Sequence, residues 1–386
     1  MPPRSSPDAV GTRRRRFAPW TETVSRIGLA LFFLFVFLVG VKSLETGIGA
    51  LGEDLVDDVF ASVSSPIAGL AAGILATVLV QSSSVTTATI VGLVGSGVLP
   101  VEAAVPIVMG ANIGTTVTNT LASLGHVRQS AYFERAFAAA TVHDYFNILA
   151  VIVLLPAEII FGLISKIASW ASSTFDGLLP AVEGSSPIKD AIKAPVGWLA
   201  DLLEGMGSAG LAGPVLLVTG LALIFVALWQ ITHQMKTVMS GRIENAINSI
   251  LSRGAGMGAI IAGLIMTVAV QSSSITTSIM VPLVAAGVLT LANAFPVTLG
   301  ANLGTTVTAL LASVAADSPD ALTIALAHVV FNVLGILIFY PFPALRRIPL
   351  RLATRTATAA VKRRSMVLVY IVCLFILSPL VIILLA

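Results

Sequence analysis

Charged residues are scarce in this chain of 386 residues, at 11% of the total, whereas soluble proteins carry roughly a quarter. Apolar side chains make up 56% and the mean hydropathy is +0.97. This composition excludes an ordinary soluble domain and indicates a polytopic membrane protein. Cysteine is nearly absent: Cys373 stands alone in the last apolar run, which excludes an intramolecular disulfide. The net charge of +3 comes from basic clusters that flank apolar runs, so it indicates topology and no nucleic-acid partner.

The few charges that are present alternate in sign between the connecting segments. Residues 45–58 are acidic, while residues 232–253 and 346–364 are basic. Because basic residues are enriched in cytoplasmic loops, we expect the acidic loop outside and the two basic loops inside. The arginine-rich tail 1–23 then stays in the cytoplasm, and residues 24–44 form an uncleaved first transmembrane helix.

An internal repeat organises the chain. The segment that begins AGILATVLVQSSS at Ala72 aligns without a gap with AGLIMTVAVQSSS at Ala262, and roughly 30 of about 53 positions are identical. The pattern HxxFN recurs further on, as His143–Asn147 and His328–Asn332. Shared hydrophobicity does not produce such identity, so we expect two copies of one structural unit.

The two copies enter the membrane from opposite sides on this charge map. Repeat 1 (59–164) lies between acidic segments and repeat 2 (254–345) between basic ones. The apolar pieces 66–80 and 85–99, at about 15 residues each, are too short to span comfortably and predict a re-entrant hairpin with QSSS at its tip. The expected fold class is therefore an all-α polytopic membrane protein with two inverted-topology repeats, each with a re-entrant hairpin and a broken transmembrane helix.

The remaining segments connect these repeats. We expect an extracellular loop at 165–213, a linking transmembrane helix and cytoplasmic loop at 214–253, a basic cytoplasmic loop at 346–365 and a C-terminal transmembrane helix at 366–386. Trp170, Trp198 and Trp229 are interpreted as span filler or as anchors at the membrane interface.

Each hairpin tip carries one glutamine and three serines. Irregular backbone survives at membrane depth only when it is buried or lines a cavity. For a single serine, a hydrogen bond to a neighbouring helix is the ordinary explanation, but the same four residues in register in both repeats indicate a binding site. These residues are Gln81, Ser82, Ser83, Ser84, Gln271, Ser272, Ser273 and Ser274.

A second repeated motif follows each hairpin, GANIGTTVT at Gly110–Thr118 and GANLGTTVT at Gly300–Thr308. Two glycines four apart with an asparagine between them predict a helix that breaks in mid-membrane. Close helix packing by small residues is the alternative. A broken helix exposes a half-helix N-terminus, which binds anions, and unwound carbonyls, which bind cations. Both motifs therefore contain candidate ligands.

Ionisable side chains are nearly missing from both repeats. Glu102 is the only one between residues 61 and 124, and none lies between 254 and 314. An anion bound here would need helix dipoles and co-bound cations to neutralise it, and hydroxyl, amide and carbonyl oxygens suit a hard alkali ion. Asp144 is the one acid inside a span near the repeats, so we expect a functional role for it, with a hydrogen-bonded pair with His143 or a position near the membrane edge as the alternatives.

With these motifs the chain resembles the type II sodium-dependent phosphate cotransporters, a family marked by paired QSSS repeats. The segments PIVMGANIGTTVTNTLASL and FERAFAAATVHDYFN are similar to the vertebrate members almost residue by residue. The resemblance implies sodium-driven phosphate uptake, with the substrate between the two hairpin tips. Asp144, together with Ala138 and Ala140, implies electrogenic transport with an additional sodium ion.

The candidate ligands follow from the motifs and the resemblance together. The candidate phosphate ligands are the eight residues of the two QSSS motifs with Thr115 and Thr305. The candidate sodium ligands are Ser83, Asn112, Thr116, Asp144, Asn147, Ser273, Asn302, Thr305 and Thr308. Sodium is the only metal expected, as a coupling ion, and neither a cofactor nor a catalytic residue is expected.

The expected function is a symporter that imports inorganic phosphate with sodium by alternating access, as a multi-pass protein of a bacterial inner (plasma) membrane. The bacterial origin follows from residues 165–213, which lack the cysteines of the family's large extracellular loop. His126 and Gln129 also depart from the vertebrate pattern. The expected partners are phosphate, sodium and membrane lipid.

Three other functions remain open at this stage. A sodium-coupled carrier of another divalent anion, such as a dicarboxylate, would use the same polar groups. An anion channel would share the polar tips without sodium sites. An intramembrane enzyme would use a QSSS serine with His143 as base, although a nucleophile does not require duplication.

Overall fold

The computed structural model describes residues 20–51, 65–178, 187–205, 209–253, 256–316 and 318–385, and this part of the chain is built from helices and contains no strand. By length and composition, seven helical segments within it can cross a membrane. They are Trp20–Gly49, Val101–Ser123, Ser130–Phe161, Gly210–Met239, Leu291–Ala315, Pro319–Phe339 and Ser365–Leu385. The expected all-α polytopic membrane protein is confirmed.

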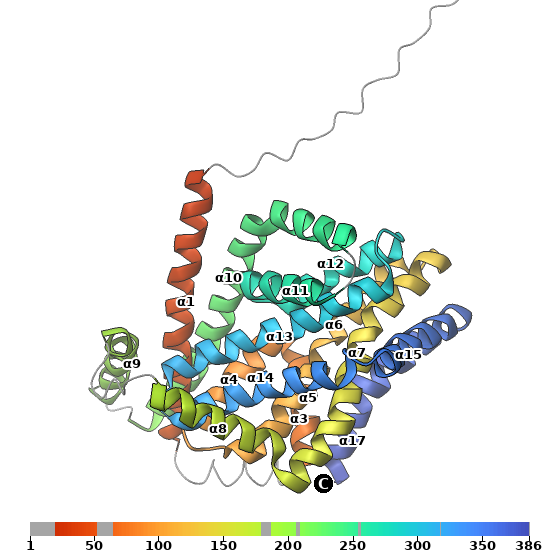
Figure 1. The fold of residues 1–386 in the computed structure, drawn as a ribbon. Coiled ribbons are helices and arrows are strands. Elements are labelled where there is room, and N and C mark those ends of the chain that lie inside the picture. The colour runs from red at the N-terminus through yellow and green to blue at the C-terminus, as the bar shows by residue number, and fades with distance from the viewer. Residues whose placement is uncertain are drawn as a thin grey trace, which may run out of the picture.

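Two sets of helices correspond to the two repeats of the sequence, and Figure 1 labels most of them. Repeat 1 contains α3 (Pro66–Val80), α4 (Ser83–Gly95), α5 (Val101–Thr115), α6 (Val117–Ser123) and α7 (Ser130–Phe161). Repeat 2 contains α11 (Met257–Val270), α12 (Ser273–Ala285), α13 (Leu291–Ala315) and α14 (Pro319–Phe339). The other helices are α1 (Trp20–Gly49), α8 (Leu163–Leu178), α9 (Pro187–Gly205), α10 (Ala209–Arg253), α15 (Pro343–Lys362), α16 (Ser365–Val372) and α17 (Ser378–Leu385), with a π-helical turn at Cys373–Leu377 between the last two.

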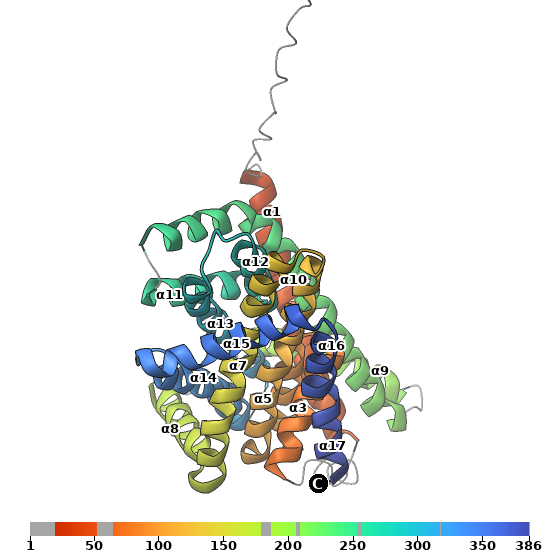
Figure 2. The same ribbon diagram turned by 90° about the vertical axis from the view of Figure 1, so that its right-hand side faces the viewer.

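Each QSSS motif joins two short apolar helices, as the sequence predicts. α3 and α4 meet at the first motif, and α11 and α12 at the second. Gln81 and Gln271 end the first helix of each pair in the left-handed region, both at φ 56°. α11 and α12 lie toward the Trp20 end of α1, while α3 lies toward the opposite end (Figures 1 and 2). The two hairpin tips therefore approach each other from opposite ends of the molecule.

The expected broken transmembrane helix is wrong for repeat 2, because α13 runs without interruption through Gly300–Thr308. Gly300 packs so closely on α11 that a Cβ added to it would lie 1.8 Å from the Ile260 carbonyl oxygen. The Thr305 hydroxyl donates to the Ala301 carbonyl of its own helix at 3.1 Å. The glycine thus serves close helix packing, and the threonine leaves the helical hydrogen bonds in place.

In repeat 1 the helix is interrupted at a single residue, Thr116, between α5 and α6. In a continuous α-helix the Thr116 amide would donate to the Asn112 carbonyl. That carbonyl instead accepts the side-chain amide of Asn147 at 2.8 Å. The equivalent side chain in repeat 2, Asn332, donates to the His328 carbonyl of its own helix at 3.0 Å. One asparagine contact therefore accounts for the difference between the two helices.

α1 and α10 form a closely packed pair beside the repeats. A Cβ added to Gly47 of α1 or to Gly220 of α10 would lie 2.5 Å from a backbone nitrogen of the other helix. This contact places α10 along the side of both hairpin tips.

Two segments that were expected as loops contain helices. Within 165–213 the chain forms most of α8 and all of α9, with residues 179–186 and 206–208 outside the described part. The basic segment 346–365 forms most of α15, which packs on α7. Its spacing of buried residues is helical, at Pro349, Ala353, Ala357 and Ala360.

Candidate functional site

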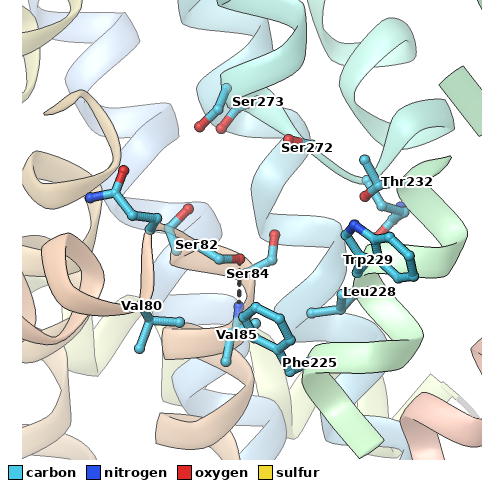
Figure 3. A pocket seen from close by; sticks show the side chains of 14 residues that line it. Val80, Ser82, Ser84, Val85, Phe225, Leu228, Trp229, Thr232, Ser272 and Ser273 are labelled. Atoms are coloured by element: carbon cyan, nitrogen blue, oxygen red, sulfur yellow. Dashed lines mark hydrogen bonds between the residues drawn. The ribbon is translucent and has the colours of Figure 1, made fainter. Parts of the chain in front are cut away.

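One cavity of about 260 Å³ lies between the two hairpin tips, and we refer to it as the tip cavity. All eight residues of the two QSSS motifs line it, with Val80, Val85 and four residues of α10: Phe225, Leu228, Trp229 and Thr232. Figure 3 shows Ser82 and Ser84 on one side of the cavity, Ser272 and Ser273 on the other, and the α10 side chains between them at the edge. The structure thus brings the two motifs together, although 190 positions of sequence separate Gln81 from Gln271.

Two helix N-termini meet the tip cavity. Ser82 caps α4, with its Oγ accepting from the Val85 amide at 3.3 Å, and Ser272 caps α12 in the same way, at 3.4 Å from the Ile275 amide. A helix N-terminus carries partial positive charge and unpaired amide groups, and both favour an anion. These N-termini take the place of the half-helix ends that the sequence predicted from the GANIGTTVT and GANLGTTVT motifs.

The lining of the tip cavity is polar but uncharged. None of its 14 residues is ionisable. Ser83, Ser84 and Ser273 are buried. A doubly charged anion in this setting has no lysine or arginine to neutralise it, so its charge must be offset by helix N-termini and by cations that bind with it.

The two glutamines connect the tips to the longer helices. Gln271 Oε1 accepts the Thr308 hydroxyl of α13 at 3.0 Å, and Gln81 Oε1 accepts the Thr118 hydroxyl of α6 at 3.3 Å. The Thr308 hydroxyl also lies 3.4 Å from the Ser84 hydroxyl of the other repeat. Three uncharged oxygens therefore converge at Thr308, a set of ligands that suits an alkali ion.

Thr115, Thr116 and Thr305 do not line the tip cavity. Each is buried, and each hydroxyl donates to a carbonyl of its own helix, at 2.8, 2.8 and 3.1 Å. The hydroxyl hydrogens are therefore engaged within the helices, while the oxygens keep lone pairs that can contact an ion.

The predicted asparagines form a second polar cluster, which joins the repeats. His143 Nε2 donates to Asn302 Oδ1 at 2.9 Å, and Asn302 Nδ2 donates to Asn147 Oδ1 at 2.7 Å. Asn147 in turn donates to the Asn112 carbonyl. The counterpart groups in repeat 2 lack such partners: both ring nitrogens of His328 and Asn332 Oδ1 are buried without a hydrogen bond. The alternative of a pair between His143 and Asp144 finds no support, because His143 Nε2 bonds to Asn302 while His143 Nδ1 and Asp144 Oδ1 are both without a hydrogen-bond partner.

Asp144 is completely buried in α7. Its Oδ2 accepts the Tyr370 hydroxyl of α16 at 2.7 Å and the Thr120 hydroxyl of α6 at 3.2 Å. Its Oδ1 has no hydrogen-bond partner. Among the described residues no lysine, arginine or histidine forms an ion pair with it. An ionised carboxylate buried in this way is costly unless a cation joins it.

Sequence reasoning missed the residues of α10 that line the tip cavity, which we call the α10 wall, and the hydrogen-bond partners of Asp144. Trp229, which was interpreted as span filler or an interface anchor, lines the tip cavity. An apolar transmembrane helix contains no pattern that marks which of its faces meets a cavity. Thr120 and Tyr370 lacked a signal of their own, because neither belongs to a motif found in both repeats.

Comparison with known proteins places the chain in a family. The family model described as Na+/Pi-cotransporter matches residues 36–172 and 223–354, more than half of the chain. Sodium-dependent phosphate transport protein 2A of Rattus norvegicus is 33% identical over 425 residues, which cover 92% of this chain and 66% of the rat protein. Sodium-dependent phosphate transport protein 2B of Homo sapiens is 32% identical over 448 residues, which cover 93% of this chain and 65% of the human protein. No solved structure matches the chain significantly.

The chain thus spans about two thirds of the length of the relatives that it matches. Each of the two matched blocks contains one QSSS motif, so the match includes both sides of the tip cavity. The chain belongs to the Na+/Pi-cotransporter family.

Proposed function

We propose that this protein is a sodium-coupled symporter that imports inorganic phosphate by alternating access, in a bacterial inner membrane. The observation that supports it most is the tip cavity, where two capped helix N-termini and eight motif residues from both repeats meet without a charged side chain. The relatives are named sodium-dependent phosphate transport proteins, which is the function that this site chemistry fits.

Phosphate would bind between the two tips. The first-turn amides of α4 and α12 and the hydroxyls of Ser83 and Ser273 donate to its oxygens, as helix N-termini do to other phosphates. Four oxygens in tetrahedral array can accept from both sides at once, which a site made from only one tip would not satisfy. The ten proposed phosphate ligands remain those predicted from the sequence, with Thr115 and Thr305 lying outside the cavity lining.

Sodium ions would supply the charge that the protein lacks. The oxygens of Thr308, Gln271 and Ser84 offer one position beside the phosphate. The asparagine cluster around Asn302 and Asp144 offer further positions. Three sodium ions moving with one divalent phosphate carry one net positive charge inward, which makes transport electrogenic.

The repeats supply the two conformations that transport requires. If the two hairpins belong to inverted repeats, as the charge map predicts, each can close the tip cavity toward its own side of the membrane. Alternating access then consists of the two repeats exchanging roles around a substrate that stays between their tips.

Uptake of labelled phosphate into proteoliposomes tests the function. A sodium gradient should drive accumulation, and an equal potassium gradient should not. Ser272→Ala with Ser82→Ala should reduce uptake strongly, because each removes a cap and a hydroxyl at the cavity, whereas Ser173→Ala, an exposed serine of α8, serves as the control. Uptake that is indifferent to the sodium gradient would sink the proposal.

Two competing functions predict different results in the same assay. A dicarboxylate carrier would be inhibited by succinate and not by arsenate, and a phosphate symporter shows the reverse. An anion channel would conduct without sodium. The family consists of cotransporters, so the protein is not an enzyme.

A further inference from the structure

The last transmembrane segment makes one polar contact deep in repeat 1. The Tyr370 hydroxyl of α16 donates to Asp144 Oδ2 at 2.7 Å. The Tyr370 ring is fixed by Phe137, Tyr145 and Phe375, whose ring centroids lie 5.9, 6.4 and 6.4 Å away. Tyr370 lies beyond the residues that the family model matches. The π-helical turn that begins at residue 373 follows it closely, a local distortion that is frequent at functional sites.

The Asp144 carboxylate is held by one oxygen and open at the other. Thr120 and Tyr370 both donate to Oδ2, whereas the buried Oδ1 has no partner. Two donors from two helices fix the plane of the carboxylate, because rotation about its bond would break both hydrogen bonds. The remaining lone pairs of Oδ1 are then presented in one direction, which is the arrangement that a cation ligand requires.

We propose that Thr120 and Tyr370 are positioning residues of a sodium site at Asp144, and that Tyr370 makes the C-terminal transmembrane segment part of this site. Sodium binds Asp144 Oδ1, while the two hydroxyls keep Oδ2 in place. The inference rests on the proposed function, since it takes sodium as the coupling ion.

The short helix α6 connects this site with the tip cavity. Thr120 of α6 contacts Asp144, and its neighbour Asn119 accepts the hydroxyls of Thr277 and Ser278 of α12 at 2.9 and 3.2 Å. The Thr277 hydroxyl also lies 2.8 Å from the Ser273 carbonyl oxygen, within the second QSSS motif. α6 is separated from α5 by the interruption at residue 116. The sodium site at Asp144 is therefore connected by hydrogen bonds through α6 to the second hairpin.

The decisive variant is Tyr370→Phe, with Tyr145→Phe as its matched control. Tyr145 is adjacent to Asp144 in sequence, and its ring belongs to the same aromatic cluster, but its hydroxyl pairs with Thr356 of α15. Both substitutions remove one hydroxyl and keep the ring. Sodium is titrated against the purified protein without phosphate, by thermal unfolding, with potassium chloride keeping the ionic strength constant.

The sodium concentration that gives half of the maximal thermal stabilisation should rise about tenfold in Tyr370→Phe, because removing the outer-shell partner of a metal ligand weakens metal binding by about this factor. It should be unchanged in Tyr145→Phe. Thr120→Val should shift it in the same direction, and it serves as the second variant if Tyr370→Phe does not fold. On an Asp144→Asn background, Tyr370→Phe should have no further effect. In proteoliposomes, the sodium concentration that half-saturates phosphate uptake should rise by the same factor in Tyr370→Phe. The half-saturating phosphate concentration at high sodium should stay unchanged.

Different results contradict the proposed function and the sodium site at Asp144. Uptake that ignores the sodium gradient contradicts the proposed function. Equal sodium titrations for the wild type and Tyr370→Phe, or a wild type that sodium does not stabilise, overturn the inference about Asp144, whatever the uptake shows.

Discussion

Asn302 of repeat 2 donates its side-chain amide to Asn147 of repeat 1 at 2.7 Å, and this is the centre of the polar contact between the two halves of the molecule. The contact extends to His143 on one side and to the Asn112 carbonyl on the other. Each of these side chains is at most 3% exposed. Because buried polar groups are costly to leave unpaired, the cluster fixes how α13 lies against α7.

Asn302→Leu should lower the thermal stability of the protein and its sodium-driven uptake together. The substitution removes the acceptor of His143 and the donor to Asn147, and each buried group left unpaired costs about 1–3 kcal/mol. Asn332→Leu, at the place in repeat 2 that corresponds to Asn147, is the control for stability, because its Oδ1 has no partner and its amide donates only within its own helix. Thermal unfolding in detergent should show the larger loss for Asn302→Leu, and equal losses contradict the assigned role of the cluster.

His328→Leu should reduce transport without lowering the thermal stability of the protein. Both ring nitrogens are buried without a partner, so removing them should leave the unfolding temperature unchanged or raise it. In an inverted-repeat transporter the two halves exchange conformations, and the partners of His328 are then expected to form in the opposite-facing state. Uptake should therefore fall about tenfold, which corresponds to the loss of a hydrogen bond worth about 1.4 kcal/mol. Normal uptake by a stable His328→Leu protein would show that the asymmetry has no role in transport.

Gly110→Ala and Gly300→Ala should both destabilise the protein. A Cβ at these positions would lie 2.0 Å from the Leu70 carbonyl oxygen and 1.8 Å from the Ile260 carbonyl oxygen, so the hairpin helix must move away. Overpacking of this kind costs about 1–3 kcal/mol. Gly125→Ala, where no atom lies within 4 Å of the added Cβ, is the control. An unfolding temperature equal to that of the control for either variant contradicts the close packing.

The internal repeat and the hydropathy pattern predict most of the helices, because both are properties of long segments, while the inverted topology drawn from the charge map stays a prediction. The helices of both hairpins and the seven spans lie where hydropathy places them. The GANLGTTVT motif was misinterpreted because two glycines and an asparagine have two uses. They weaken a helix, and they also let a neighbouring helix approach closely. The Ile260 carbonyl packs against Gly300, so in repeat 2 the motif serves close packing.

Duplication was the main signal for the candidate site, and Asp144, which faces Val329 in the alignment of the repeats, was predicted instead because it is an acid inside a span. Repetition identified the QSSS serines and the asparagines, since the two copies reinforce each other. Trp229 and Tyr370 come from helices outside the repeats and meet the sites through tertiary packing. Nothing in their local sequence distinguishes them from other aromatic residues in apolar spans, so only the three-dimensional arrangement identifies them.

Asp144→Gly should keep sodium-driven phosphate uptake while abolishing the inward current. The substitution removes the only carboxylate of the proposed sodium sites, so one positive charge fewer accompanies each phosphate. Radioactive uptake and current are measured on the same preparation, and their ratio gives the charge moved per phosphate. An unchanged ratio refutes the role assigned to Asp144, while loss of both signals makes the carboxylate essential for coupling rather than for the additional charge.

Trp229→Ala should raise the half-saturating phosphate concentration without changing the half-saturating sodium concentration at high phosphate. Trp229 lines the tip cavity from α10 and excludes water from one side of it, and water competes with the hydroxyls and amides that bind phosphate. Trp198→Ala is a close control, because the two tryptophans are 60% and 67% exposed and Trp198 lies on α9, away from the cavity lining. If both variants shift phosphate dependence equally, the effect comes from losing a surface tryptophan and the α10 wall has no part in the site. A shift confined to Trp229→Ala makes α10, which belongs to neither repeat, a third side of the phosphate site beside the two hairpin tips.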